Sequence, residues 1–291
     1  MDVTEVMDAF RKVLDVEPVE TNFFRGLPQP GARGRTFGGQ VIAQALMSAI
    51  KTVEDDKPAH SLHAYFMRPG EATAPVLYQV ERDRDGRSFA TRRVVAVQNG
   101  QPILNLAASF HHVEPGWSHA SPMPDVPPPE DLPDETALGE AMADQLRPAV
   151  LDFLRRPKPI EMRPVHARPP FDRSPRPAVQ SCWFRVRGQL PDDPKLHRVA
   201  LAFASDYALM GTAMVPHSKA FDDPDIMTAS LDHALWLHDD FRADDWLFYD
   251  MDSPWAGGGR GLNRGRIFTR DGRLVANAAQ EGLMRPVTPR G

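Results

Sequence analysis

The chain has 291 residues, 42% of them hydrophobic, and its 34 basic and 39 acidic residues give a formal net charge of −5. This length is enough for one large hydrophobic core or two ordinary domains. The small negative charge, without a dense block of Lys and Arg, argues against a nucleic-acid partner. Charged residues interrupt the apolar ones throughout residues 1–16. We therefore predict no signal peptide, no membrane span and a cytoplasmic location.

The first half is predicted to hold a helix followed by antiparallel strands. Apolar residues at helical spacing in "GGQVIAQALMSAIKTV" predict a helix over residues 38–53. A strand, "HSLHAYFMRPG", follows it, and "RRVVAVQNGQPILNLAASF" is typical of a hairpin that turns at Asn99-Gly100. Asn-Gly is a strong hairpin signal because a type I′ turn needs two residues that tolerate positive φ.

A proline-rich connector is predicted in the middle of the chain. Fifteen of the 29 prolines fall between Pro115 and Pro177, and proline removes backbone donors and disfavours both helix and sheet. Inside this stretch, "ETALGEAMADQLRPAVLDFLRR" has apolar residues at helical spacing and predicts a docked helix. We therefore divide the chain into an N-terminal domain (1–115), the connector (116–178) and a C-terminal domain (179–291).

The second half repeats the pattern of the first. We predict a helix over residues 205–215, "SDYALMGTAMV", then a strand, "TASLDHALWLH", then a hairpin, "RGRIFTRDGRLVANAAQEG", that turns at Asp271-Gly272. A shift of 172 residues lays this hairpin on the first one and brings Gly100 onto Gly272. Periodicity and repetition alone indicate a duplicated α+β fold.

Several segments in a fixed order resemble the type II acyl-CoA thioesterases, the TesB-like family. The segments are "RTFGGQVIAQAL", "HSLHAYFMRPG", "RDGRSFATRRVVAVQNGQPI", "LAFASDYALM", "SLDHALWLH" and "LVANAAQEGLMR". The resemblance implies a double hot-dog fold, in which two antiparallel sheets each wrap around a long helix and form an internal pseudo-dimer. It also implies hydrolysis of fatty acyl-CoA to a fatty acid and coenzyme A, without a cofactor, by a homodimer or larger homo-oligomer.

The resemblance assigns a catalytic role to Asp206, Ser230 and Gln280, which match the family's three water-holding residues. A thioester carbonyl is activated and its thiolate leaves readily, so a positioned water suffices without a covalent intermediate. We expect Asp206 to lie in the first turn of the predicted helix, after a Ser205 cap, where the positive helix end favours the carboxylate. The family usually has threonine where Ser230 stands, and serine lacks the methyl group that restricts the rotamer.

The complete set of three polar residues, Asp206, Ser230 and Gln280, occurs only in the second half of the chain. When the halves are laid over one another, Asp206 falls on Gly39 and Gln280 falls on Ala108, while Ser230 falls on Ser61, so the first half lacks the acid and the amide. We therefore predict one active site per chain. Gly38 and Gly39, at the start of the first helix, are candidate substrate-binding residues because glycine allows a close approach to backbone donors.

Further candidates are His60, Arg260 and Arg264. His60 is a candidate base beside the substrate groove, although the role of a hydrogen-bonded structural histidine is favoured over it. His233, on the second-half strand, is assigned to packing. The segment "WAGGGRGLNRG" lacks the strand-turn-helix order of a nucleotide loop, but Arg260 and Arg264 could meet coenzyme A phosphates. The single cysteine, Cys182, is expected to be an inert buried thiol.

Alternatives remain at this stage. Outside the family context, Asp206 is simply an acidic residue near a helix end and Gln280 an edge-strand amide. The chain could be a hot-dog hydratase or dehydratase, but no histidine closely follows Asp206. It could also be a non-catalytic acyl-CoA-binding protein. We expect no metal, because the run His238–Asp240 has no second ligand cluster at metal spacing.

Overall fold

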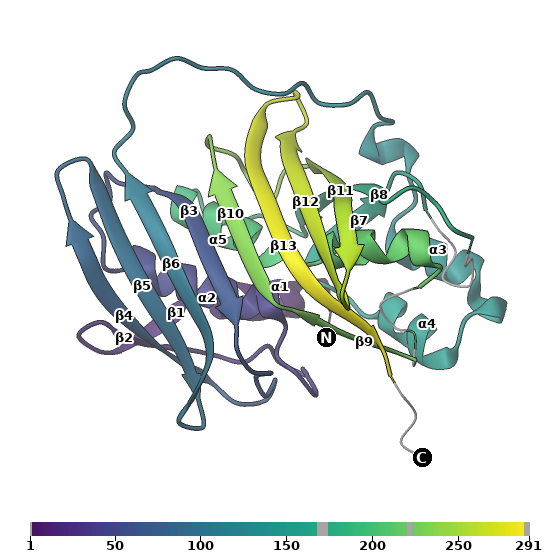
Figure 1. Ribbon diagram of the computed structural model, residues 1–291, viewed down its shortest axis with the longest axis horizontal. Coiled ribbons are helices and arrows are strands. Elements are labelled where there is room, and N and C mark those ends of the chain that lie inside the picture. The colour runs from purple at the N-terminus through teal and green to yellow at the C-terminus, as the bar shows by residue number, and fades with distance from the viewer. Residues whose placement is uncertain (1, 168–173, 220–222, 224, 288–291) are drawn as a thin grey trace.

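The computed structural model describes residues 2–167, 174–219, 223 and 225–287. Their strands form one antiparallel sheet in the order β1-β2-β4-β5-β6-β3-β10-β13-β12-β11-β8-β7, with β9 paired to β13. Figure 1 shows the sheet across the front of the molecule and the helices behind it. The strands are β1 (Val16–Glu20), β2 (Phe23–Gly26), β3 (Ala59–Phe66), β4 (Val76–Asp85), β5 (Phe89–Gln98), β6 (Gln101–His111), β7 (Ile160–Pro164), β8 (Val179–Val186), β9 (Ile226–Ser230), β10 (Asp232–Leu237), β11 (Leu247–Gly257), β12 (Arg260–Thr269) and β13 (Leu274–Pro286).

The two halves of the chain meet at the pair β3 and β10. Leu62 lies opposite Leu235 in this pair, and the backbone N–H of Phe66 donates to the carbonyl of Leu231 just beyond it. An unpaired strand edge exposes backbone donors and acceptors, so pairing these two edges satisfies both. The two sheets expected from the sequence are thus joined into one continuous sheet.

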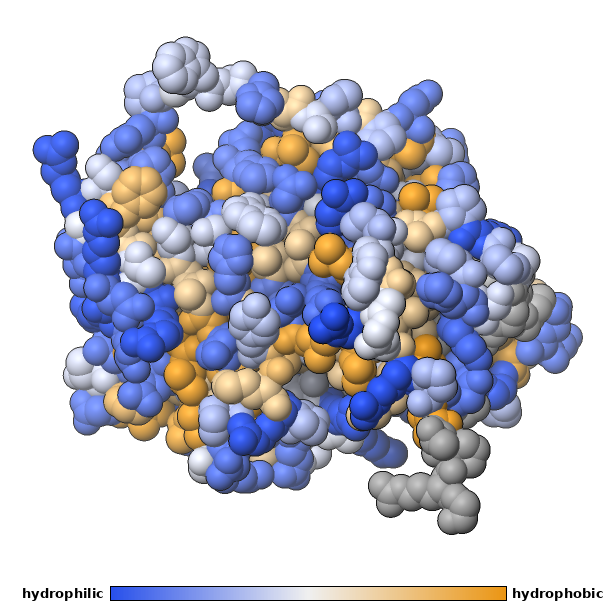
Figure 2. Space-filling model, viewed as in Figure 1, coloured by the Kyte–Doolittle hydropathy of each residue, from blue (hydrophilic) through white to orange (hydrophobic). Residues whose placement is uncertain are grey.

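The sheet buries one face and exposes the other. In β4 and β5, buried and exposed residues alternate along the strand, as a strand with one buried face requires. The outer face in Figure 2 is a mixture of hydrophilic and apolar residues. The helices are α1 (Val3–Leu14), α2 (Gly38–Ile50), α3 (Glu135–Ala141), α4 (Pro148–Arg155) and α5 (Pro194–Ala204), with the 3₁₀ helices η1 (Pro129–Asp131), η2 (Ala143–Gln145) and η3 (Leu209–His217). The inner face packs against α2 in the first half and against η3 in the second half, while α1 and α5 pack on α2.

Helices α2 and α5 pack against each other in opposite directions. A side chain at Gly39, near the start of α2, would lie 2.3 Å from the carbonyl oxygen of Phe203, near the end of α5. At the other end, Lys195 in the first turn of α5 forms an ion pair with Asp55, which follows α2. The start of α2 therefore faces the end of α5.

The second-half helix begins earlier than the sequence suggested. The prediction placed it over residues 205–215, but α5 ends at Ala204 and residues 209–217 form the 3₁₀ helix η3. The start of α5 has ordinary signals, since the Asp193 side chain accepts a hydrogen bond from the N–H of Lys195 and Pro194 occupies the first turn. Asp206 consequently follows a helix instead of beginning one.

Both predicted hairpins are present, with different turns. Asn99 and Gly100 have φ of 50° and 72° between β5 and β6, as a type I′ turn requires. Between β12 and β13 only Gly272 has positive φ, 88°. The N–H of Gly272 donates to the carbonyl of Thr269, and the pairing shifts register at Ile267. The second turn is longer, and a bulge at Val275 in β13 accompanies it.

The predicted connector contains more structure than one helix. Its helical segment is divided into α3, the 3₁₀ helix η2 and α4, which begins at Pro148, and Gly139 of α3 packs closely against Leu154 of α4. Strand β7 also lies in this stretch and pairs with β8 at the edge of the sheet. Residues 168–173 of the connector lie outside the described residues.

In the described part of the chain, one helical stretch, Pro194–His217, is long and apolar enough to cross a membrane. It combines α5 with η3, and 78% of its apolar window is buried inside the fold. Contacts with α2 and with strands of the sheet account for this burial, which is usual for a core helix.

Candidate active site

Asp206 lies where the end of α5 faces the start of α2. Its residue surface is 9% exposed. A side chain at Gly38 would lie 2.6 Å from the Asp206 Oδ2 and 2.9 Å from the ring of Phe66, so only glycine fits there. The backbone N–H of Gly39 donates to the Asp206 carboxylate. One half of the chain thus supplies the acid and the other half supplies the helix start that receives it.

Gln280 and Ser230 reach the same carboxylate oxygen from the sheet. Gln280, fully buried on β13, donates from Nε2 to Asp206 Oδ1 at 2.5 Å. Ser230, the last residue of β9, donates from Oγ to the same oxygen at 3.4 Å. Because Ser230 lies opposite Gly282, two residues beyond Gln280, strand pairing places both side chains beside the acid. The structure therefore brings together the three residues predicted to form the site.

Burial dominates the acidity of Asp206. Desolvation raises the pKa of its carboxyl from 3.8 to about 6, although hydrogen bonds from Gln280, the Gly39 N–H and Ser230 lower the pKa in part. The sequence prediction that a helix start would favour the anion named the wrong helix. The helix is α2 instead of the residue's own, and its stabilisation is smaller than the desolvation. Ser205, predicted as an N-cap, is the C-cap of α5.

His233 is a further member of this cluster that was not predicted. It is fully buried on β10, and its Nε2 lies 2.9 Å from Ser205 Oγ. Its Nδ1 lies 3.3 Å from Gln280 Nε2. Burial lowers the pKa of His233 to about 4, so the imidazole is neutral near pH 7. The signal was strand parity, because His233 shares the buried face of β10 with Leu235 and Leu237.

The other predicted candidates, His60, Arg260 and Arg264, bond to residues outside the Asp206 cluster. His60 bonds to Ser109 Oγ at 2.8 Å and packs against Phe89 and His111, and burial, followed by the charge of His111, lowers its pKa. Arg260 lies 3.3 Å from Glu281 and packs over Trp255. Arg264 forms a two-point ion pair with Asp252. Both arginines are therefore already paired with carboxylates of the protein.

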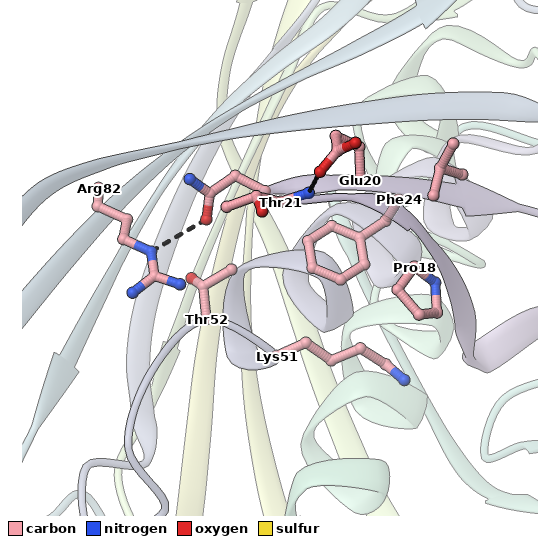
Figure 3. Close-up of a pocket in the computed structure, with 9 residues that line it drawn as sticks. Pro18, Glu20, Thr21, Phe24, Lys51, Thr52 and Arg82 are labelled. Atoms are coloured by element: carbon pink, nitrogen blue, oxygen red, sulfur yellow. Dashed lines mark hydrogen bonds between the residues drawn. The ribbon is translucent and has the colours of Figure 1, made fainter.

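Two surface cavities lie away from Asp206. The first, about 410 Å³, is lined by β1 and β2 together with Lys51, Thr52 and Arg82 (Figure 3). The second, about 640 Å³, is lined by residues at the start of α5, including Asp192 and Pro194. Because Asp206 lies at the start of α2 and the end of α5, these cavities are at the far ends of the two helices, roughly 15–20 Å away at 1.5 Å per residue. Neither cavity is lined by Asp206, Ser230 or Gln280.

The described residues contain no group of three or more His, Cys, Asp or Glu side chains arranged to hold a metal ion. Cys182 is buried, and desolvation, followed by the charge of Glu135, raises its thiol pKa to about 12. A thiol with this pKa stays protonated and is a poor nucleophile near neutral pH.

Comparison with known proteins connects this cluster to a family. Residues 27–111 match the family model described as the acyl-CoA thioesterase N-terminal domain, and residues 124–284 match the one described as its C-terminal domain. The chain is 44% identical to acyl-coenzyme A thioesterase 8 of Homo sapiens, over 94% of this chain and 88% of that protein.

Solved structures give the same picture. The chain resembles the crystal structure of acyl-CoA thioesterase II TesB2 from Mycobacterium marinum, with 43% identity, a TM-score of 0.78 and coverage of 96% of this chain and 99% of that one. It also resembles a protein with a hot-dog fold from Alicyclobacillus acidocaldarius, with 21% identity, a TM-score of 0.77 and coverage of 96% and 99%. The large antiparallel sheet packed on its helices is therefore a hot-dog fold.

Proposed function

Because this chain belongs to the acyl-CoA thioesterase family and is a thioester hydrolase, we propose that it splits fatty acyl-CoA with one water held by Asp206, Ser230 and Gln280, without a covalent intermediate. The observation that carries this proposal is the convergence of Ser230 and Gln280 on one oxygen of a buried carboxylate. Both donors orient Asp206, and its second oxygen faces the start of α2.

Asp206 acts as the general base in this mechanism. It accepts a proton from the water as the oxygen attacks the thioester carbonyl, and the coenzyme A thiolate leaves. A base works best when its pKa is close to the working pH, and burial raises the pKa of Asp206 to about 6. The same residue would be a weaker base at its ordinary pKa of 3.8.

The start of α2 supplies the electrostatic part of the mechanism. The Gly39 N–H is used by Asp206, so the N–H of Gly38 is the donor we assign to the developing oxyanion. Loss of one such donor often costs about 3–4 kcal/mol in the transition state. The first half therefore serves as substrate site and the second half as base, which gives one active site per chain.

We also propose that the fold is a double hot-dog with an internal pseudo-dimer. Each half contributes one long buried helix, α2 or α5, and these helices pack antiparallel as two subunits related by a two-fold axis would. We further propose a cytoplasmic enzyme that forms a homodimer or larger assembly. Light scattering tests the assembly, and a 32.4 kDa monomer at micromolar concentration would contradict it.

The mechanism is tested by thiol release from acyl-CoA of several chain lengths. Asp206→Asn should lower kcat by about 10²- to 10⁴-fold, the usual contribution of general base catalysis. Gln280→Ala should follow, and the double variant should be scarcely worse than Asp206→Asn because residues that act as a unit are not additive. Rapid quenching and intact-mass measurement test the chemistry, since an acyl adduct on the protein would contradict direct attack by water.

A further inference from the structure

A chain of hydrogen bonds runs behind the catalytic carboxylate. It begins at the carbonyl of Ala202 in α5, which can only accept. Ser205 Oγ lies 3.1 Å from that oxygen and donates to it. A hydroxyl has a single hydrogen, so Ser205 Oγ must accept its second bond, which comes from His233 Nε2 at 2.9 Å. The proton of the neutral imidazole is therefore on Nε2, and Nδ1 carries a lone pair.

The tautomer of His233 determines which way the Gln280 amide points. The amide end assigned as Nε2 lies 3.3 Å from His233 Nδ1 and 2.5 Å from Asp206 Oδ1. Both neighbours are acceptors, and only the amide nitrogen has two hydrogens to give them. The carbonyl end, Oε1, must therefore point the other way, where it is buried and bonds to none of the described residues. A buried acceptor without a partner costs about 1–3 kcal/mol, so this atom is expected to bind a donor such as water.

We infer that His233 is a positioning residue for thioester hydrolysis, which locks the Gln280 amide so that Oε1 accepts a hydrogen bond from the attacking water. This inference rests on the proposed function. With one water hydrogen on Gln280 Oε1 and the other on Asp206, the oxygen lone pair is directed at the thioester carbon. If the amide rotated by about 180°, Oε1 would face the Asp206 carboxylate and an N–H would face the water.

The hydrogen bond from Gln280 gives His233 a role beyond filling space in the core. The Gln280 side chain is fully buried, so bulk water cannot supply the partner that His233 provides. Burial also lowers the pKa of His233 to about 4, which keeps Nδ1 unprotonated, and able to accept, above about pH 5. His233 does not need to touch the substrate, because its effect passes through Gln280.

Two variants of His233 separate the effect of losing the hydrogen-bond acceptor from the effect of losing side-chain volume. His233→Leu fills the space without an acceptor and should lower kcat about 10- to 100-fold, because a small misplacement in an active site can cost about 10²-fold, with KM changed less than about twofold. His233→Asn keeps an acceptor oxygen near the position of Nδ1 and should recover most of this loss. The matched control is His197→Asn. His197 is also buried, on α5, accepts from the Ala243 N–H, and should change stability without lowering kcat.

A measurement on the unmodified enzyme covers the case in which the variants do not fold. Nitrogen NMR of ¹⁵N-histidine-labelled protein at pH 7 should show two buried neutral imidazoles with the hydrogen on Nε2, His197 and His233, and Ser205→Ala should disturb the signal of His233 alone. An Nδ1–H tautomer, or a folded His233→Leu protein with unchanged kcat, would overturn the inference. If Asp206→Asn is inactive in the same experiment while His233→Leu is not, the proposed function stands and only the role of His233 fails; full activity of Asp206→Asn would instead overturn the proposed function.

Discussion

Replacing Asp206 by Asn is expected to stabilise the protein while it lowers kcat about 10²- to 10⁴-fold. Burial raises the pKa of the folded Asp206 carboxyl from 3.8 to about 6. The folded state therefore holds the proton more tightly than the unfolded state, and stability falls as the pH rises from about 4 through 6. A difference of about two pH units corresponds to about 3 kcal/mol of lost stability at neutral pH. Asparagine carries no charge and avoids this loss.

The expected gain is smaller than the full electrostatic cost. The asparagine of this variant can still accept from Gln280, but its amide nitrogen cannot accept from the Gly39 N–H, and one such bond is worth about 1 kcal/mol. The net gain is then about 2 kcal/mol, or roughly 3–6 °C in Tm for a chain of this size. Calorimetry of both proteins between pH 4 and pH 8 should show no gain near pH 4 and the full gain above pH 7.

Asp244 is a control whose pKa is shifted in the opposite direction to that of Asp206. Burial alone would raise its pKa, but hydrogen bonds from Arg242 and the Leu190 N–H outweigh burial and lower it. The stability that Asp244 contributes is present above its ordinary pKa and is lost as the pH falls through the folded pKa. Asp244→Asn should therefore destabilise the protein at pH 7 and less so in acid. If Asp206→Asn lowered Tm equally at every pH, the assignment of a buried, costly anion would be refuted.

Four further predictions concern activity. Because Asp206 must be ionised to accept a proton, kcat/KM for a fixed acyl-CoA should fall about tenfold per pH unit below about pH 6; a flat pH profile down to pH 4.5 would exclude this base. Ser230→Thr should leave kcat intact or improve it, since threonine keeps the hydroxyl with a stiffer rotamer, whereas Ser61→Ala, in the first half, should have little effect; an inactive but folded Ser61→Ala protein would contradict a single site per chain. Activity should survive dialysis against a chelator, and loss of activity that a divalent ion restores would show a metal requirement.

Local features of the fold, such as a tight turn, could be predicted from the sequence, whereas the start and end of the second-half helix could not. The Asn99-Gly100 turn depends on two adjacent residues, so its hairpin was found. The start of the second-half helix was misplaced, although Asp193 and Pro194 are ordinary start signals. Residues 205–215 are as apolar as a helix core, but most of them belong to a 3₁₀ helix that contains Pro216. Periodicity over eleven residues cannot distinguish these two states.

The sequence predicted three residues of the candidate site but not the contact between Asp206 and the start of α2. Asp206, Ser230 and Gln280 were matched through family resemblance, because residues 24 to 74 positions apart have no local signal in common. The contact between Asp206 and Gly38 joins residues from different halves and depends on α2 and α5 packing antiparallel. The positive start of a second helix stabilises the anion only in part, so Asp206 keeps a pKa near the working pH instead of one too low for proton transfer.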